Sequence, residues 1–138
     1  MMVSFSVSFS LKKGFLTLSG GQYTGDTEMY NAETDSWKII AQNPEMLSYQ
    51  FFSVIHFNHN PLVFGGSRFE AEESTSRDVY RLRKKNETFS WSKFEEKLMS
   101  ARHQHTSIQR GNTIIHIGGH SKEPYEVWEE NDDGERDI

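Results

Sequence analysis

Residues 113–119 read Thr-Ile-Ile-His-Ile-Gly-Gly, a short apolar run closed by two glycines. The same arrangement occurs earlier, where Leu62-Val63-Phe64 leads into Gly65-Gly66 and the segment 15–19 leads into Gly20-Gly21. Two glycines at a strand end permit backbone angles and a close chain approach that a side chain would forbid. The pairs recur at spacings of about 45 and then about 53 residues, which is typical of an array of one supersecondary unit.

Each glycine pair is followed by an acidic-apolar-aromatic triplet, and two of the units then reach a tryptophan, Trp37 or Trp91. The triplets are Glu28-Met29-Tyr30, Asp78-Val79-Tyr80 and Glu126-Val127-Trp128. We place these triplets at equivalent positions of a third strand and expect the aromatic rings to pack one sheet against the next. A single sheet cannot bury its own faces, so such a unit must repeat.

Each unit is predicted to form an antiparallel meander, because runs joined by a few Gly, Asn or Lys residues indicate hairpins. The predicted first strands are 4–11, 51–57 and 104–109, and the second strands are 15–19, 62–64 and 113–117. The third strands surround the triplets, and the fourth begin at the two tryptophans. No stretch has the period of a helix. Ser and apolar residues alternate from Val3 to Leu11, which predicts a strand and not a signal peptide.

Composition excludes several classes of protein. The 138 residues fit one domain, and the net charge of −5 argues against nucleic acid as a partner. A mean hydropathy of −0.71, with no apolar stretch near the roughly 20 residues that a bilayer requires, argues against a membrane span. The absence of cysteine rules out disulfides, thiol nucleophiles and thiolate metal sites, and weakly favours a cytoplasmic location.

Neither a metal nor a catalytic site is expected. His103 and His105 lie two apart on a presumed strand, hence on one face, with His116 and His120 nearby, but no carboxylate or cysteine completes a zinc ligand set. No Ser/His/Asp spacing and no phosphate-binding glycine loop stand out. We therefore expect no cofactor and no enzyme activity.

Apolar run, Gly-Gly, spaced tyrosine and tryptophan together resemble the kelch repeat, and Met99-Ser100-Ala101-Arg102 is similar to that family's entry into a blade. The resemblance covers roughly Val3 to Asn131. It implies an all-β fold, an incomplete kelch-type β-propeller of about three four-stranded antiparallel blades, the last lacking its final strand. The expected blades span approximately 3–40, 48–94 and 100–130, followed by an acidic, disordered tail at 131–138. The sequence departs from the family at Gln50, where arginine is common, at Thr17 and Pro61, and in the third unit, which lacks its tryptophan.

Propellers typically close with about 4–8 blades, so three units leave both ends of the stack uncovered. Three explanations fit: a fragment of a longer protein, association with further blades or further copies of the chain, or an open arc. We favour the fragment.

The resemblance also implies a function, a non-catalytic protein–protein interaction module that binds a protein or peptide. It points to the substrate-recognition part of a cullin-type ubiquitin ligase adaptor; the alternatives are an actin-associated scaffold and, from another class, a fragment of a propeller enzyme. Partners of such propellers commonly contact one rim of the ring. The corresponding positions here follow each Gly-Gly pair or lie in the turn entering each first strand: Gln22, Tyr23, Tyr49, Gln50, Ser67, Arg68, Arg102, His103, His120 and Ser121. Arg68 and Arg102 are the preferred candidates, because guanidinium groups suit peptide carboxylates.

Overall fold

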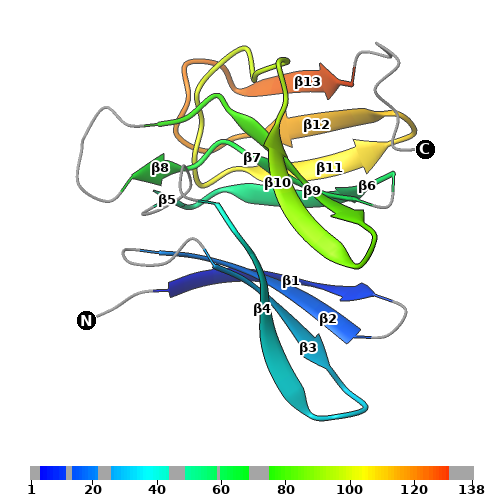
Figure 1. Cartoon of the computed structure of the whole chain (residues 1–138). Helices are drawn as coiled ribbons and strands as arrows, with labels where there is room; N and C mark the ends of the chain where they lie inside the picture. The colour runs from blue at the N-terminus through cyan, green and yellow to red at the C-terminus, as the bar shows by residue number, and fades with distance from the viewer. Residues whose placement is uncertain are drawn as a thin grey trace.

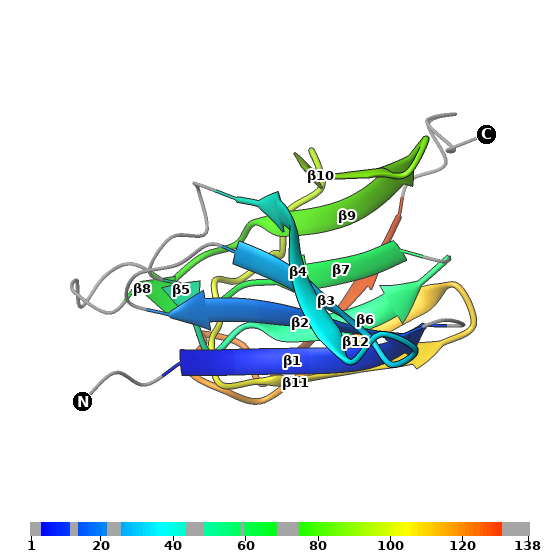
Figure 2. The ribbon, with the colours of Figure 1, turned by 60° about the horizontal axis from the view of Figure 1, so that its bottom comes forward.

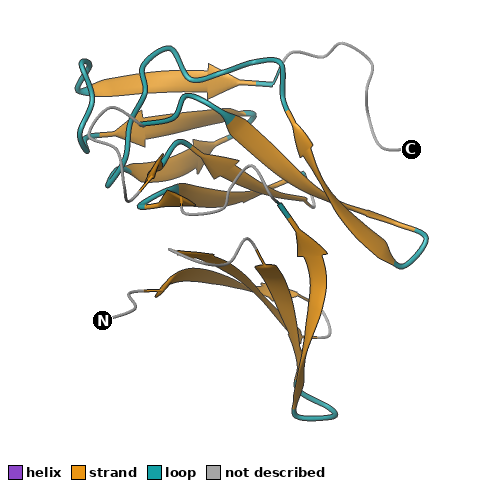
Figure 3. Ribbon diagram, turned by 60° about the vertical axis from the view of Figure 1, so that its left-hand side comes forward, coloured by secondary structure: helices purple, strands orange, loops and turns teal. Residues whose placement is uncertain are grey.

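The computed structural model describes residues 4–11, 14–21, 26–43, 49–58, 60–68 and 75–130. Within these ranges the protein is all-β, its strands pair antiparallel, and the absence of a helix leaves none that could cross a membrane (Figure 3). The predicted fold class is confirmed at this level. Two predicted rim residues, Gln22 and Tyr23, and the acidic tail lie outside the described residues.

Three meanders follow one another along the chain, and we call them sheets 1, 2 and 3 (Figure 1). Sheet 1 contains β1 (Ser4–Leu11), β2 (Gly14–Gly21), β3 (Asp26–Asn31) and β4 (Ser36–Gln42). Sheet 2 contains β6 (Ser53–Phe57), β7 (Asn60–Phe64), β9 (Val79–Lys85) and β10 (Thr88–Lys93). Sheet 3 contains β11 (Thr106–Arg110), β12 (Thr113–Ile117) and β13 (Tyr125–Glu129). The predicted sequence of four, four and three strands is confirmed.

A small sheet of β5 (Tyr49–Gln50) and β8 (Ser67–Arg68) was not expected from the sequence. Its two strands are too short to show a period of two, so the alternation of apolar and polar residues carried no signal for it. Both strands consist of predicted rim residues.

Sheet 2 lies between the other two (Figures 1 and 2), and the side chains of its strand β7 are buried on both faces. The face toward sheet 3 contributes to a cluster in which Leu62, Phe64 and Val79 are at most 1 % exposed. The opposite face, toward sheet 1, carries a second cluster centred on Val63 and Tyr80. Because a central sheet needs no polar face, its middle strand β7 has a continuous apolar run.

The glycine pairs after β7 and β12 take left-handed backbone angles, with φ between 67° and 98°. In each pair, one glycine also lies against neighbouring backbone. A Cβ on Gly65 would come within 2.4 Å of the Arg102 carbonyl oxygen, and one on Gly119 within 2.3 Å of that of His103. Both the angle and the space therefore require glycine at Gly65 and Gly119.

The register of the third strands corrects the predicted alignment of the triplets. In sheet 2 Val79 pairs with Phe64, directly before Gly65, whereas in sheet 3 the residue opposite Ile117, directly before Gly118, is Tyr125. Tyr80 therefore corresponds to Glu126, and the residue corresponding to Trp128 is Leu82. The triplets of the second and third units are out of step by two residues, a shift that keeps every side chain on its face.

The predicted packing role of the aromatic residues is only partly right. Tyr80 and Trp128 are buried between sheets, and Trp91 packs against the second cluster. Trp37 instead is 55 % exposed and contacts Tyr30 on the face of sheet 1 that points away from sheet 2. No further sheet within the described residues covers that face.

Candidate functional site: a rim of paired loop segments

Predicted rim residues from separate segments pair with one another beside sheet 2. In the β5–β8 ladder, Tyr49 lies opposite Arg68 and Gln50 opposite Ser67. One segment enters the first strand of the sheet, and the other follows its Gly-Gly pair. The structure thus brings together two sets of positions that the sequence listed separately.

Sheet 3 repeats this arrangement. His103 and His120 form an isolated antiparallel bridge, with the His120 amide donating to the His103 carbonyl at 2.9 Å. Their imidazole rings stack, with centroids 4.8 Å apart and planes 12° from parallel. His103 and His120 occupy the places that Gln50 and Ser67 hold in sheet 2, at the spacing that separates Gly65 from Gly118. We use the name rim for these paired residues and Ser121. The pairs are Tyr49–Arg68, Gln50–Ser67 and His103–His120.

The rims of sheets 2 and 3 are joined into one surface. Thr75 forms a bridge with Ser67, and its hydroxyl lies 3.1 Å from Nδ1 of His103. The Phe51 and His103 rings are 6.4 Å apart. The Gln104 amide donates to the Phe51 carbonyl at 2.9 Å. The two rims are therefore linked through Thr75, Phe51 and Gln104.

Phe51 and Gln104 also fix the correspondence between the two entry segments. Both have a left-handed backbone, with φ of 58° and 55°, although neither is glycine. This shared conformation places Tyr49, and not Gln50, at the position of Arg102.

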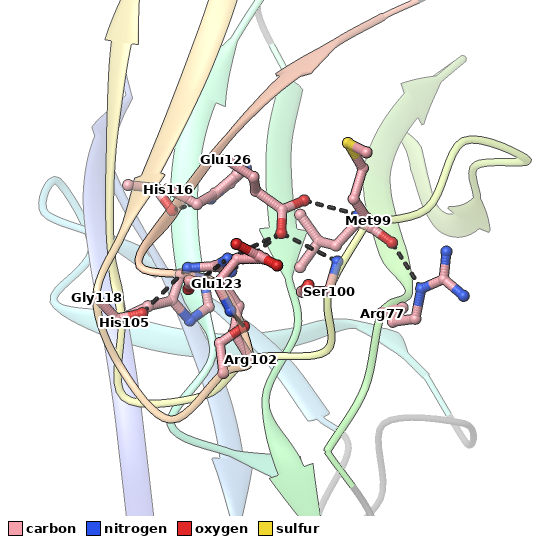
Figure 4. Close-up of polar contacts among 12 residues, drawn as sticks. Arg77, Met99, Ser100, Arg102, His105, His116, Gly118, Glu123 and Glu126 are labelled. Atoms are coloured by element: carbon pink, nitrogen blue, oxygen red, sulfur yellow. Dashed lines mark hydrogen bonds and ion pairs between the residues drawn. The ribbon is translucent and has the colours of Figure 1, made fainter.

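The prediction that Arg102 lies exposed on the rim is wrong. Its side chain is fully buried, with 0 % exposure. Nε and Nη2 donate to Oε2 of Glu126 at 3.2 and 3.0 Å, Nη1 donates to the Gly118 carbonyl, and Nη2 also donates to the Glu123 carbonyl (Figure 4). All three guanidinium nitrogens are thus engaged inside the protein, so Arg102 supports the rim from below and is not available to a partner.

Glu126 completes this buried anchor. Its Oε1 accepts the Met99 amide at 2.8 Å, and its Oε2 accepts the Ser100 amide at 3.1 Å. The carboxylate therefore fixes the entry segment that precedes the rim, while Arg102 fixes the strand end at Gly118. Buried ions are tolerated only with such complete pairing and hydrogen bonding.

A buried chain of hydroxyl and imidazole groups lies beside this anchor. The Ser53 hydroxyl is 2.8 Å from Nε2 of His105 and in short contact with the Ser107 hydroxyl, which is 2.7 Å from Nδ1 of His116. Burial, aided by the nearby Arg102 and His103, lowers the pKa of His105 to about 4. Burial, with His105 and Arg102 nearby, lowers the pKa of His116 to about 3. Both rings are therefore neutral at physiological pH.

The four histidines form two pairs and not one ligand set. The left-handed Gln104 interrupts the strand, so His103 and His105 do not share a face as predicted: His103 stacks on His120, while His105 lies against His116 with ring centroids 5.6 Å apart. No group of three or more His, Cys, Asp or Glu residues within the described ranges is arranged to hold a metal. Ser53 and His105 are both buried, and no carboxylate among those residues bonds Nδ1 of His105, so they lack the third member of a nucleophilic triad.

The remaining predicted rim residues differ in exposure. His120 is exposed, and Ser67, His103 and Ser121 are half-buried. Burial and the neighbouring His120 lower the pKa of His103. The residues that sequence reasoning missed are those beneath the rim, namely Ser53, His105, Ser107, His116 and Glu126. The alternation of side chains along the strands, counted back from Gly118, is the signal that could have placed Ser107, His116 and Glu126 on one face of sheet 3.

Comparison with known proteins yields neither a matching family model nor a match among curated proteins.

Proposed function

We propose that this chain is a non-catalytic protein-interaction module built from kelch-like blades, which binds a peptide segment of a partner along the rim. One observation carries the proposal: in two successive sheets, the entry segment and the segment after Gly-Gly meet in matched backbone bridges, Gln50 with Ser67 and His103 with His120. Binding residues are often found on loops that a rigid scaffold positions.

The chemistry of the rim supports a peptide ligand. The His103 imidazole, whose pKa is lowered, and the Ser67 and Ser121 hydroxyls both donate and accept hydrogen bonds, as a peptide backbone requires. The segment after Gly65-Gly66 also contains an arginine, Arg68. The finer proposal, the substrate-recognition part of a cullin-type ubiquitin ligase adaptor, rests on the family resemblance alone.

The test is selection of a peptide display library on the immobilised chain, followed by affinity measurements on the selected peptides. We expect Arg68→Ala with His120→Ala to weaken binding about thirty-fold, the equivalent of a hot spot of about 2 kcal/mol. Glu87→Ala is the matched control, because Glu87 lies in the β9–β10 turn at the far end of sheet 2 from Gly65. Selected peptides that bind the double variant as well as the parent chain would overturn the rim assignment.

A further inference from the structure

The outer face of sheet 3 is apolar and uncovered by any described residue. Ile108, Ile117 and Val127 are 46 to 48 % exposed, and Tyr125 is 63 % exposed. The register places Ile117 opposite Tyr125 on this face. These residues alternate with side chains that are buried against sheet 2. A contiguous exposed apolar patch of this kind marks an interaction surface.

This face corresponds position by position to a covered face of sheet 2. Phe64 and Val79, paired directly before Gly65, correspond to Ile117 and Tyr125, paired directly before Gly118. Phe64 and Val79 are 0 % exposed because sheet 3 packs over them, with Trp128 in the same cluster. The exposed outer face of sheet 3 is therefore the counterpart of the face of sheet 2 on which the next sheet packs.

The outer face of sheet 1 corresponds instead to the face of sheet 2 that packs onto the preceding sheet. Trp37 pairs with Tyr30 across β4 and β3, as Trp91 pairs with Leu82 across β10 and β9. Trp91 packs onto the preceding sheet, where its indole N–H donates to the Thr27 hydroxyl at 2.9 Å. Trp37 is 55 % exposed and Ile39, two residues further along the same strand face, is 52 % exposed. Trp37 is thus the counterpart of a residue that docks on a preceding sheet.

We propose that a second copy of this chain docks head to tail, so that the outer face of sheet 1 of each copy covers the outer face of sheet 3 of the other. Thr27 lies three residues before Tyr30, as Val79 lies three before Leu82, so the counterpart of Thr27 on sheet 3 is Tyr125. Trp37 of one copy consequently packs at Tyr125 of the other.

Two such contacts close a ring, because a head-to-tail interface whose rotation closes forms a cyclic assembly. Each chain contributes three meanders, and two chains together fall within the range of about 4–8 blades with which propellers close. One chain carries both complementary surfaces, the outer face of sheet 1 and the outer face of sheet 3. For this reason we propose a second copy of the chain and not another partner. The inference depends on the correspondence between the sheets and not on peptide binding at the rim.

The experiment is the solution mass of the full 138-residue chain, measured by sedimentation velocity over a range of concentrations. We expect twice the chain mass of 16.0 kDa. Trp37→Glu and Val127→Glu, at exposed positions on the two faces, should each give a monomer. Met99→Glu is the matched control, because Met99 is 79 % exposed and lies outside all the strands, and it should leave the dimer intact.

Mixing the two monomeric variants discriminates the geometry. The mixture retains one unaltered joint, sheet 3 of the Trp37→Glu chain with sheet 1 of the Val127→Glu chain, so association should reappear with weaker affinity. A monomeric parent chain overturns the proposal. A dimer that Val127→Glu disrupts and Trp37→Glu spares also overturns it, because that pattern indicates two sheet 3 faces packed together. Circular dichroism verifies that each variant is folded, and Tyr125→Lys provides a second change on sheet 3. Peptide binding by the monomeric variants tests the rim separately.

Discussion

The same four positions carry apolar side chains in the second unit and polar side chains in the third. In sheet 2 they form the cluster that faces sheet 1, and in sheet 3 they form the hydrogen-bonded network that faces sheet 2. The apolar set is Phe52, Val54, Val63 and Tyr80, and the corresponding polar set is His105, Ser107, His116 and Glu126.

This difference shows that equivalent positions in successive sheets can hold neighbouring sheets together either by apolar contacts or by hydrogen bonds and an ion pair. Apolar contacts are non-directional, so the joint between sheets 1 and 2 depends mainly on buried area and shape. Between sheets 2 and 3, an apolar cluster that includes Phe64 and Trp128 is accompanied by hydrogen bonds and a buried ion pair, which require definite angles and so restrict the geometry of that joint. The cost is that each polar group must keep its partner.

The largest effect is expected from removing the carboxylate of the polar joint. Glu126→Ala leaves the Arg102 guanidinium buried without a counter-ion and two backbone amides without an acceptor. We expect the free energy of unfolding to fall by about 3–5 kcal/mol, measured by urea denaturation. Glu87→Ala breaks the exposed Lys84–Glu87 pair and serves as the control, with an expected loss below about 1 kcal/mol. Equal losses in the two variants would show that the buried pair does not hold the joint.

The next effect is a dependence of stability on pH, to which the polar joint contributes through two buried histidines, His105 and His116. The folded pKa values of His105 and His116, about 4 and about 3, lie below the ordinary value of 6.5. Unfolded chains therefore bind more protons, and the stabilising contribution is complete above pH 6.5 and is lost as the pH falls toward 4 and 3. We expect the free energy of unfolding to fall by up to about 1.4 kcal/mol per pH unit for each ring over this window, measured by denaturation at a series of pH values.

His116→Gln should reduce this pH dependence and leave the part that is due to His105. A parent chain whose stability does not change between pH 6.5 and 4 would contradict the assignment of two buried neutral rings.

The smallest effect is expected from placing one hydroxyl in the apolar joint. Val63→Thr preserves shape but buries a polar group within a cluster of Phe52 and Tyr80, where Val63 is 0 % exposed. A loss of about 2 kcal/mol in the free energy of unfolding is expected from calorimetry or urea denaturation. Val54→Thr, half-buried in the same cluster, is the matched control and should cost less. An unchanged stability for Val63→Thr would mean that the apolar joint accepts polar groups as readily as the polar one does.

The sequence predicted the strands well because glycine pairs and short polar turns mark where strands end. The first strand, Ser4–Leu11, and the second strand of the third unit, Thr113–Ile117, were predicted at their observed bounds. Register was less accessible. An acidic-apolar-aromatic triplet can shift by two residues without changing which face its side chains occupy, so the pattern did not distinguish Tyr80 from Leu82 as the counterpart of Trp128.

The sequence predicted which positions form the rim, but it did not predict the buried Arg102–Glu126 pair beneath them. Charged residues are seldom fully buried, so an arginine beside a turn was expected at the surface. Only the pairing of His116 with Glu126 across β12 and β13 brings a carboxylate to Arg102, and that contact depends on the register that the sequence left open.

The close approach at Gly65 also has a consequence for the order in which the protein can be completed during synthesis. The Gly66 amide, at the end of β7, donates to the Arg102 carbonyl, which belongs to the segment entering sheet 3. The end of the second unit is therefore finished by residues that leave the ribosome only after the whole of that unit. Sheet 2 gains its last backbone partners when the third unit begins to form, so we expect the two units to fold cooperatively.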